Sequence, residues 1–291
     1  MIRIGTRASA LALAQAQWVA ERLPDEAELV PMKTAGDRSR AVGDKSRWVS
    51  GLEEALLQGE IDLAVHSAKD VPAQLAPGLS LVAIPSRADP RDAICGAGSL
   101  GSLTCGASVG TSSLRRAAQI RALRDDLEVV EIRGNVDTRL RKLAEGAVDA
   151  LVLACAGLER LGRLDEAGGL LDELVPAAGQ GALAVEGRDG AVPAAVIDAL
   201  DDPAASTCVH AERELTRHLN ATCNTPVGAF ARPVGAGEVE LSAWVGMPDG
   251  SQWISDRLRG ASDGLGAAVA ERMLTAGAGE LLRRAQRGLA A

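Results

Sequence analysis

The first 180 residues contain the same order of strands and helices twice, and this repeat constrains the fold more than any other feature of the sequence. Each copy opens with a short apolar strand that ends in Gly-Thr and runs into a helix. The paired segments are a first strand (2–6 and 108–111), a helix (11–22 and 114–123), a second strand (29–32 and 129–132) and a third strand (59–65 and 146–152). Because near-continuously apolar strands alternate with helices, we expect two similar α/β domains, each built on a parallel sheet covered on both faces.

The ends of these strands are the expected place for a ligand, because such sheets bind ligands beyond the carboxyl ends of their strands. Both Gly-Thr turns and the segment 66–72 fall there. We therefore expect the facing edges of the two domains to form a binding cleft.

The pattern changes near Ala204, after glycine, proline and aspartate residues that mark the approach at 187–203. A helix is predicted up to Arg217, followed by a turn-rich segment, three short strands and helices at 263–275 and 279–288. This order predicts a small α+β third domain.

Charge and composition exclude several classes of function. The net charge is −8, and the aromatic residues are four Trp, one Phe and no Tyr, so neither a basic face nor base-stacking platforms are expected for nucleic acid or an anionic membrane. No run reaches the roughly 18 apolar residues of a membrane span, and no signal peptide is expected, so we expect a cytoplasmic protein. The five cysteines include no CxxC pair, which predicts free thiols and argues against a zinc ribbon, and we expect no bound metal.

Polar and cationic residues follow the first strand of each copy. They are Arg7 and Ser9 in the first copy, and Thr111, Ser112, Ser113, Arg115 and Arg116 in the second. Helix N-termini favour anions, and arginine forks bind carboxylates in a bidentate manner. Plain helix capping with solvated arginines is the alternative for each turn alone.

The segment Val65–Pro72 places polar residues directly after a predicted buried strand. Asp70 is the natural acid, base or stabiliser of a cation there, with Ser67 and Lys69 beside it. An Asp70 that pairs with Lys69 or caps a turn is the alternative. We expect His66 to be a packed core residue.

A second arginine group follows the second strand of the second copy. Arg133 and Arg139 are expected to reach the cleft, whereas Arg141 and Lys142 fit a solvated helix face. Arginines gathered at strand ends in an acidic chain indicate a ligand with several carboxylates.

Cys223 lies in a turn-like segment where a thiol can be exposed and reactive. A buried structural cysteine is the alternative, and that description suits Cys155, which we place inside an apolar strand. The spacing of Cys208, His210, His218 and Cys223 matches no standard metal site. The run 179–184 fits the dinucleotide fingerprint only weakly, because it does not follow the first strand of a βαβ unit.

Taken together and in order, these segments resemble the porphobilinogen deaminase (hydroxymethylbilane synthase) family along the whole chain. The motifs are Gly5-Thr6-Arg7-Ala8-Ser9, Val65-His66-Ser67-Ala68-Lys69-Asp70-Val71-Pro72, Asp89-Pro90-Arg91-Asp92, Gly110-Thr111-Ser112-Ser113-Leu114-Arg115-Arg116, Arg133-Gly134-Asn135, Gly179-Gln180-Gly181-Ala182 and Cys223-Asn224-Thr225-Pro226-Val227-Gly228.

The resemblance implies two domains like those of periplasmic binding proteins, followed by a domain that carries a cofactor cysteine. The implied domains are 1–86 with 181–202, 87–180, and 203–291. It also implies a transferase of tetrapyrrole (haem-type porphyrin) biosynthesis that condenses four porphobilinogen molecules on a covalent dipyrromethane and releases linear hydroxymethylbilane. Cys223 would hold the dipyrromethane through a thioether.

The resemblance also implies residue roles. Asp70 would stabilise the cation formed when porphobilinogen loses ammonia and take part in deprotonation. The remaining implied residues bind the cofactor or substrate: Arg7, Ser9, Lys45, Ser67, Lys69, Thr111, Ser112, Ser113, Arg115, Arg116, Arg133, Gly134, Arg139, Arg160 and Gln180.

Two segments depart from the family pattern. Ala221-Thr222 stands before the cofactor cysteine where the family often has paired glycines, and the loop between Asp37 and Trp48 is shorter than in familiar members. Two other functions stay open: a two-lobed binding module, which needs neither Cys223 nor a third domain, and a Cys-dependent hydrolase. As an enzyme, the chain is expected to be a monomer that hands its unstable product to uroporphyrinogen-III synthase.

Overall fold

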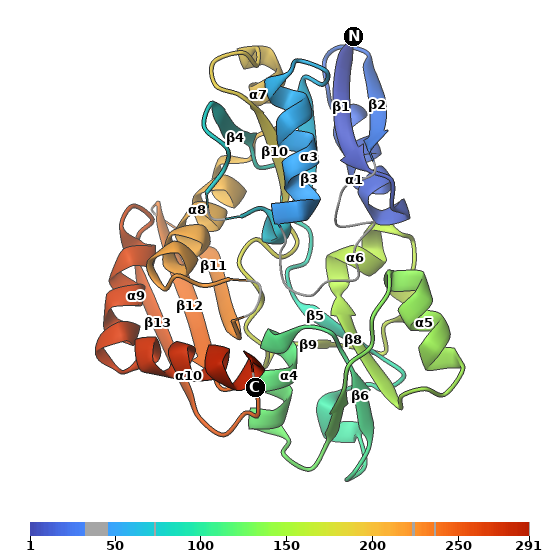
Figure 1. Cartoon of the computed structure of the whole chain (residues 1–291), viewed down its shortest axis with the longest axis vertical. Helices are drawn as coiled ribbons and strands as arrows, with labels where there is room; N and C mark the ends of the chain where they lie inside the picture. The colour runs from blue at the N-terminus through green and yellow to red at the C-terminus, as the bar shows by residue number, and fades with distance from the viewer. Residues whose placement is uncertain (33–45, 73, 223–224, 236, 291) are drawn as a thin grey trace. The chain divides into compact units, whose positions relative to one another are not determined.

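The computed structural model describes residues 1–32, 46–72, 74–222, 225–235 and 237–290. The chain divides into two compact units. Figure 1 shows the chain coloured by residue number. The first unit comprises Met1–Ala88 and Gly181–His210, and the second comprises Asp89–Gln180 and Ala211–Ala291. The described part of the chain contains no helix long and apolar enough to cross a membrane.

The first unit is built on a five-stranded sheet in the order β2-β1-β3-β10-β4. Its strands are β1 (Ile2–Arg7), β2 (Ala27–Met32), β3 (Leu63–Ser67), β4 (Leu79–Ala83) and β10 (Leu183–Arg188). β1 runs parallel to β2 and β3, whereas β10 runs antiparallel to both β3 and β4. A strand from late in the sequence therefore completes the first sheet.

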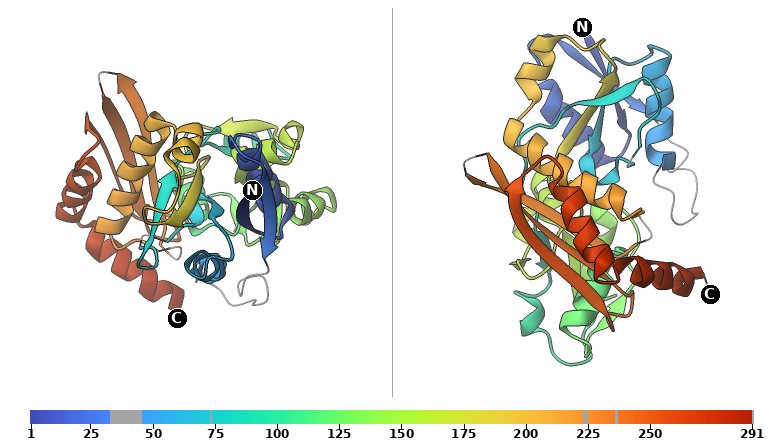
Figure 2. Two further views of the ribbon diagram at one scale, coloured as in Figure 1. Left: turned by 90° about the horizontal axis from the view of Figure 1, so that it is seen from above. Right: turned by 90° about the vertical axis from the view of Figure 1, so that its left-hand side faces the viewer.

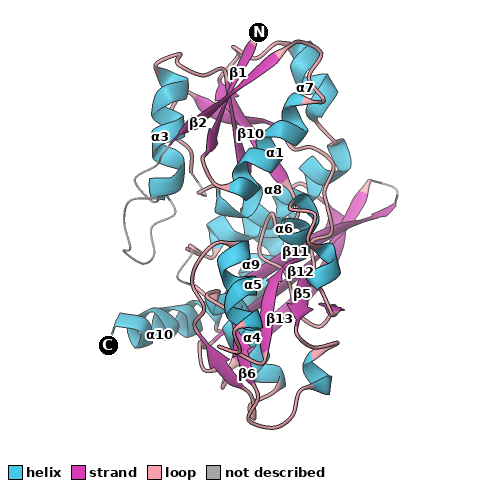
Figure 3. Ribbon diagram, turned by 90° about the vertical axis from the view of Figure 1, so that its right-hand side faces the viewer, coloured by secondary structure: helices cyan, strands magenta, loops and turns pink. Residues whose placement is uncertain are grey.

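Helices cover both faces of this sheet, as Figure 3 shows. Helix α1 (Ala10–Ala20) packs on the face of Leu63 and Val65, where α7 (Ala194–Leu200) also packs. Helix α3 (Ser46–Leu57) packs against Ala64, whose side chain points to the opposite face because strand side chains alternate. The strand β3 is apolar almost throughout because both of its faces are buried.

The second unit contains a sheet of the same plan, in the order β7-β6-β8-β5-β9. β6 runs parallel to β7 and β8, and β5 runs antiparallel to β8 and β9. The strands are β5 (Asp92–Cys95), β6 (Ser108–Gly110), β7 (Glu128–Val130), β8 (Ala150–Ala154) and β9 (Gly169–Leu171). The predicted repeat of two similar α/β sheets is confirmed. The prediction of purely parallel sheets is wrong, because one strand in each sheet runs against the others.

Helices cover this second sheet on both faces as well. Helix α4 (Leu114–Leu123) packs against Val109 and Val152 through Ile120, while α5 (Val136–Ala144) and α6 (Cys155–Arg160) pack against Leu151 on the other face. Short 3-10 helices, η2 (Leu100–Ser102) and η3 (Leu164–Glu166), lie in the connections.

The C-terminal part has the predicted α+β composition. Helix α8 (Pro203–His218) leads to three antiparallel strands in the order β11-β12-β13, and two helices follow. The strands are β11 (Val227–Gly235), β12 (Glu238–Gly246) and β13 (Trp253–Ala261), and the helices are α9 (Leu265–Thr275) and α10 (Ala278–Ala290). Helix α9 packs on β12 and β13, and α10 packs on β12 (Figure 2).

One local prediction needs correction. Cys155 is buried as expected, but it begins helix α6 instead of lying inside the strand, which ends at Ala154. The segment 187–203, interpreted as the approach to the third domain, contains the end of β10 and the whole of α7, and α8 begins at Pro203. The free thiols are confirmed for Cys95, Cys105, Cys155 and Cys208, while Cys223 lies outside the described residues.

Candidate active site

The turn after β3 carries Asp70. Ser67 ends the strand, and the 3-10 helix η1 (Ala68–Asp70) follows directly. The hydrogen bonds that hold this turn include one from Gln15 Nε2 to Ser67 Oγ over 2.8 Å, one from Ala68 N to Ala182 O over 3.0 Å, and one from Val71 N to Ala68 O over 3.3 Å. Lys69 and Asp70 are half-buried, so the predicted acid lies at the surface of a fixed turn.

The turn after β1 lies at the same edge of the sheet, because β1 and β3 are parallel neighbours. Arg7 ends β1 and is half-buried. Ser9 caps helix α1, with its Oγ accepting from Ala12 N over 3.3 Å. Capping by Ser9 is therefore confirmed, and the structure brings Arg7 and Ser9 to the strand edge that carries Ser67, Lys69 and Asp70.

The turn after β6 has the same form in the second unit. Ser113 caps helix α4 by accepting from Arg116 N over 3.4 Å, and Thr111 Oγ1 accepts from Ser113 N over 3.1 Å. Thr111 is buried, whereas Ser112 is exposed. Helix capping and anion binding are compatible here, because Ser112 remains accessible at the helix N-terminus.

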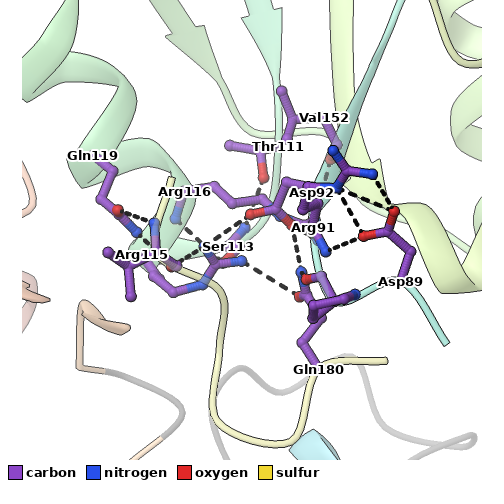
Figure 4. Close-up of polar contacts among 12 residues, drawn as sticks. Asp89, Arg91, Asp92, Thr111, Ser113, Arg115, Arg116, Gln119, Val152 and Gln180 are labelled. Carbon is purple, nitrogen blue, oxygen red and sulfur yellow. Dashed lines mark hydrogen bonds and ion pairs between the residues drawn. The ribbon is translucent and has the colours of Figure 1, made fainter. Parts of the chain in front are cut away.

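Arg115 and Arg116 meet a single buried carboxylate, as Figure 4 shows. Arg115 NH1 lies 2.8 Å from Asp92 Oδ2, and Arg116 NH2 lies 2.8 Å from Asp92 Oδ1. Gln180 Nε2 donates to the same Oδ1 over 2.8 Å and to Pro90 O over 2.7 Å. The four side chains therefore join β5, α4 and the segment at 180 into one buried network.

The charges in this network do not cancel, because two guanidinium groups face one carboxylate. Burial alone would raise the pKa of Asp92, but Arg115 and Arg116 outweigh it and hold that pKa well below its usual value. Burial lowers the pKa of Arg115, an effect that Asp92 opposes and Arg116 reinforces. This buried network therefore holds one more cationic group than carboxylates.

The other predicted arginines lie near this network or after the neighbouring strands. Burial and the positive charge of Arg116 lower the pKa of Arg139, whose Nε donates to Gly134 O over 2.7 Å. Burial lowers the pKa of Arg160, in the last turn of α6, to about 10. Arg133 is exposed and pairs with Glu131, with 2.7 Å between Nε and Oε1.

Glycine is required at Gly134, where the motif Arg133-Gly134-Asn135 turns into α5. Its φ of +127° is a conformation that other residues rarely adopt, and a Cβ there would lie 2.7 Å from the Thr138 side chain. Asn135 then caps α5 by accepting from Thr138 N over 2.9 Å.

These residues fit a ligand that carries several carboxylates. Arg115 Nε is buried and has no hydrogen-bond partner in the part of the chain that the structure describes. Burial lowers the pKa values of the partly buried Arg139 and Arg160, and such guanidinium groups gain most from an added negative charge. The acetate and propionate arms of a dipyrromethane would supply such charges.

Two predicted positions, Cys223 and Lys45, lie outside the described residues. Thr222 and Thr225 lie on either side of this gap in the sequence. Thr225 Oγ1 donates to Thr222 O over 2.6 Å and accepts from Thr222 N over 2.8 Å. Thr225 is only 5% exposed, so these hydrogen bonds between Thr222 and Thr225 are largely shielded from solvent.

Sequence reasoning gave no role to three buried carboxylates: Asp92, Glu186 and Glu212. Asp92 belongs to the motif Asp89-Pro90-Arg91-Asp92. It is an acidic residue in an otherwise apolar strand, and this signal in the sequence could have identified it. Glu212 accepts from Gly179 N over 2.6 Å and from Ala231 N over 2.7 Å. Glu186 lies 2.9 Å from His66, between its Oε2 and the imidazole Nε2.

Structural comparisons find solved structures at low similarity. The immunogenic lipoprotein A of Vibrio vulnificus aligns over 71% of this chain and 97% of its own, with a TM-score of 0.45 and 13% identity. An ABC transporter periplasmic substrate-binding protein from Coxiella burnetii aligns over 71% and 94%, with a TM-score of 0.40 and 16% identity.

Sequence comparisons are far more specific. The family model of the porphobilinogen deaminase dipyrromethane cofactor binding domain matches residues 2–195, and that of the porphobilinogen deaminase C-terminal domain matches residues 206–275. The porphobilinogen deaminase of Roseiflexus castenholzii is 47% identical over 97% of this chain and 98% of its own length. That of Geobacter sulfurreducens is 44% identical over 97% and 93%. The chain therefore belongs to the porphobilinogen deaminase family.

Proposed function

We propose that this chain is a transferase that condenses four porphobilinogen molecules, one at a time and with loss of ammonia, onto a dipyrromethane, and then releases linear hydroxymethylbilane by hydrolysis. This activity is hydroxymethylbilane synthase, a step of tetrapyrrole and haem biosynthesis. Family membership along nearly the whole chain supports it. The structural observation that carries it is the excess of guanidinium groups over carboxylates around Asp92.

The charge of that network matches the substrate. Each pyrrole of porphobilinogen carries an acetate and a propionate arm, so the growing chain gains two negative charges with every addition. Arg115 and Arg116 are held rigidly by Asp92, which reduces the side-chain entropy that ligand binding would otherwise cost. Arg139 and Arg160 add cations whose lowered pKa values make a carboxylate partner favourable.

Asp70 is assigned the reaction chemistry. Loss of ammonia from the aminomethyl group leaves a cationic azafulvene, and a fixed carboxylate beside the pyrrole N–H stabilises that positive charge. After the new carbon–carbon bond forms, the pyrrole carbon must lose a proton, and the same carboxylate assists its removal. The hydrogen bonds of Ser67 and Ala68 fix the turn from which Asp70 acts.

Cys223 would hold the dipyrromethane through a thioether. The bound cofactor would supply the pyrrole carbon to which the first unit is joined, and each later unit would be joined to the terminal pyrrole of the growing chain. The residues that would bind its arms and those of the substrate are the predicted set: Arg7, Ser9, Lys45, Ser67, Lys69, Thr111, Ser112, Ser113, Arg115, Arg116, Arg133, Gly134, Arg139, Arg160 and Gln180. Thr222 and Thr225, which flank Cys223 and Asn224 in the sequence, are hydrogen-bonded to each other.

The finer organisation also belongs to the proposal. We assign domains to 1–86 with 181–202, 87–180, and 203–291. We further assign a cytoplasmic monomer, in keeping with the free thiols of the described cysteines. Since hydroxymethylbilane is unstable in water, its direct delivery to uroporphyrinogen-III synthase would protect it.

A stoichiometric assay tests the proposed activity. Purified protein is incubated with porphobilinogen, and the ammonia released is compared with the linear tetrapyrrole formed, which closes to a coloured porphyrin after oxidation. Four ammonia molecules per tetrapyrrole are expected. Binding of porphobilinogen without any ammonia release would instead indicate a binding module.

A further inference from the structure

A buried histidine–glutamate pair in the first sheet takes no part in the chemistry described above. His66 Nε2 lies 2.9 Å from Glu186 Oε2, and the side chains are 5% and 0% exposed. Glu186 Oε1 is buried as well and has no hydrogen-bond partner within the described residues. Their neighbours on the same face, Ala64 and Ala184, belong to apolar clusters. Burying an incompletely satisfied ionisable pair costs free energy, so the pair is a poor way to stabilise a sheet.

The second sheet provides an internal comparison for this pair, because its strands follow the same order. In the first sheet, Ala64 of β3 lies beside Gly5 in β1. In the second sheet, Leu151 of β8 lies beside Gly110 in β6. Both glycines belong to the Gly-Thr turns of the repeat, so Ala64 and Leu151 occupy equivalent positions.

These equivalent positions fix the rest of the register. Two residues further along the strand, the first sheet has His66 and the second has Leu153. On the neighbouring antiparallel strand, Glu186 of β10 stands where Cys95 stands in β5. Leu153 and Cys95 are 3% and 1% exposed and belong to one apolar cluster. The same architecture is therefore built with an apolar pair at this place, and the fold itself does not require the histidine–glutamate pair.

The equivalent strands β3 and β8 lead into different elements. β3 runs into Ser67 and the short η1, which carries Asp70, whereas β8 runs directly into α6. His66 is the last residue of β3 before Ser67, and its bond to Glu186 ties this strand end to β10. Ala68 N, which donates to Ala182 O, ties the start of η1 to the segment just before the same strand.

We propose that His66 and Glu186 are positioning residues for Asp70, which hold the end of β3 against β10 so that the turn presents the carboxylate in one place. The role rests on the proposed function, because it concerns the same reaction. A displacement of about 1 Å at a reacting group can slow catalysis about 100-fold. A contact between His66 and Glu186 that fixes the start of the turn is therefore useful even though it costs stability.

The test replaces His66 and Glu186 by the residue types found at the equivalent positions of the second sheet, leucine (Leu153) and cysteine (Cys95). The double variant His66→Leu with Glu186→Cys is compared with the wild-type protein, and Cys95→Ala serves as the control at the equivalent place of the second sheet. The melting temperature, the cofactor content by intact mass, kcat and KM are measured for each, with kcat recorded well below every melting temperature. We expect the double variant to melt at or above the wild-type temperature, to carry its cofactor, and to lose about 10- to 100-fold in kcat with little change in KM. Cys95→Ala should keep its kcat.

A conservative variant separates positioning from a direct chemical role. Glu186→Gln retains an acceptor for His66 and should recover most of the kcat that the double variant loses. A Glu186→Gln variant as slow as the double variant would overturn the proposal, since the carboxylate charge itself would then be needed. Wild-type kcat in the double variant, or a kcat that falls only as its melting temperature falls, would overturn it as well. A wild-type protein that converts no porphobilinogen would instead refute the proposed function.

Discussion

Arg116 donates from its Nε to Oδ1 of Asp92 over 2.9 Å, in an interior where the aspartate is fully buried. The same carboxylate also receives Arg115 and Gln180. One acidic side chain thus organises two cationic residues of the proposed binding set.

Replacing Asp92 should strongly destabilise the protein. Asp92→Asn leaves two buried guanidinium groups without a counter-charge, and breaking a buried ion pair from one side costs about 3–5 kcal/mol. Urea denaturation gives the free energy of unfolding. Asp126→Asn is the matched control, because Asp126 also pairs with an arginine at 2.6 Å but is far more exposed than Asp92, so a much smaller loss is expected. Equal losses in the two variants would contradict the importance of burial.

The same carboxylate predicts how stability depends on pH. The folded-state pKa of Asp92 is depressed, so below the ordinary aspartate pKa of about 3.9 the unfolded chain binds a proton that the folded chain does not. The stability that Asp92 contributes is therefore present above about pH 4 and is lost progressively as the pH falls below it. Unfolding free energies measured from pH 5 down to pH 3 should decline more steeply in the wild type than in Asp92→Asn. Parallel curves would show that Asp92 titrates normally.

Glu212 should be a second point of structural sensitivity. Its two oxygens accept from Gly179 N and Ala231 N, and its side chain is completely buried. Glu212→Ala would leave two buried N–H groups unsatisfied at about 1–3 kcal/mol each, so a loss of about 2–6 kcal/mol is expected. Chemical denaturation measures it, with the exposed Glu271→Gln in helix α9 as a control that should change stability by less than about 0.5 kcal/mol. A Glu212→Ala protein as stable as this control would show that the hydrogen bonds of Glu212 do not stabilise the fold.

Asp70→Asn should remove activity without removing the fold. Asp70 lies on a surface turn, whereas its proposed role in charge stabilisation and proton transfer is worth about 100- to 10,000-fold in rate. We expect kcat to fall by that range while the melting temperature stays within a few degrees of the wild type. Asp189→Asn, at an exposed position of the same unit, is the control that should retain full activity. Comparable kcat values for Asp70→Asn and the wild type would remove Asp70 from the chemistry.

The sequence was most informative where local pattern decides structure. Helix α4 begins and ends at the predicted residues, Leu114 and Leu123, because Ser113 supplies a cap and the apolar spacing is regular. Strand direction could not be predicted in the same way. β10 pairs with β3 although about 120 residues separate them, and an apolar run does not encode whether its partner lies parallel or antiparallel.

In the candidate site as well, the local sequence predicted some features, whereas others depend on contacts between distant residues. Asp70, Arg7 and Ser9 were predicted from their places after strands, and the structure brings them to one sheet edge. The role of Asp92 depends on Arg116 and Gln180, which lie 24 and 88 residues away, and only the folded chain brings them together. His66 was predicted to be a core residue and is one, but its partner Glu186 carried no local signal.

The central claim is that pyrrole units are assembled covalently on Cys223. The most direct measurement is the intact mass of the purified protein beside a Cys223→Ser variant, each recorded with and without porphobilinogen. The account predicts an excess mass of two linked pyrroles that depends on Cys223 and grows in single-pyrrole steps when substrate is added. An unmodified wild-type mass that stays unchanged with porphobilinogen, in a protein shown to be folded, would contradict it.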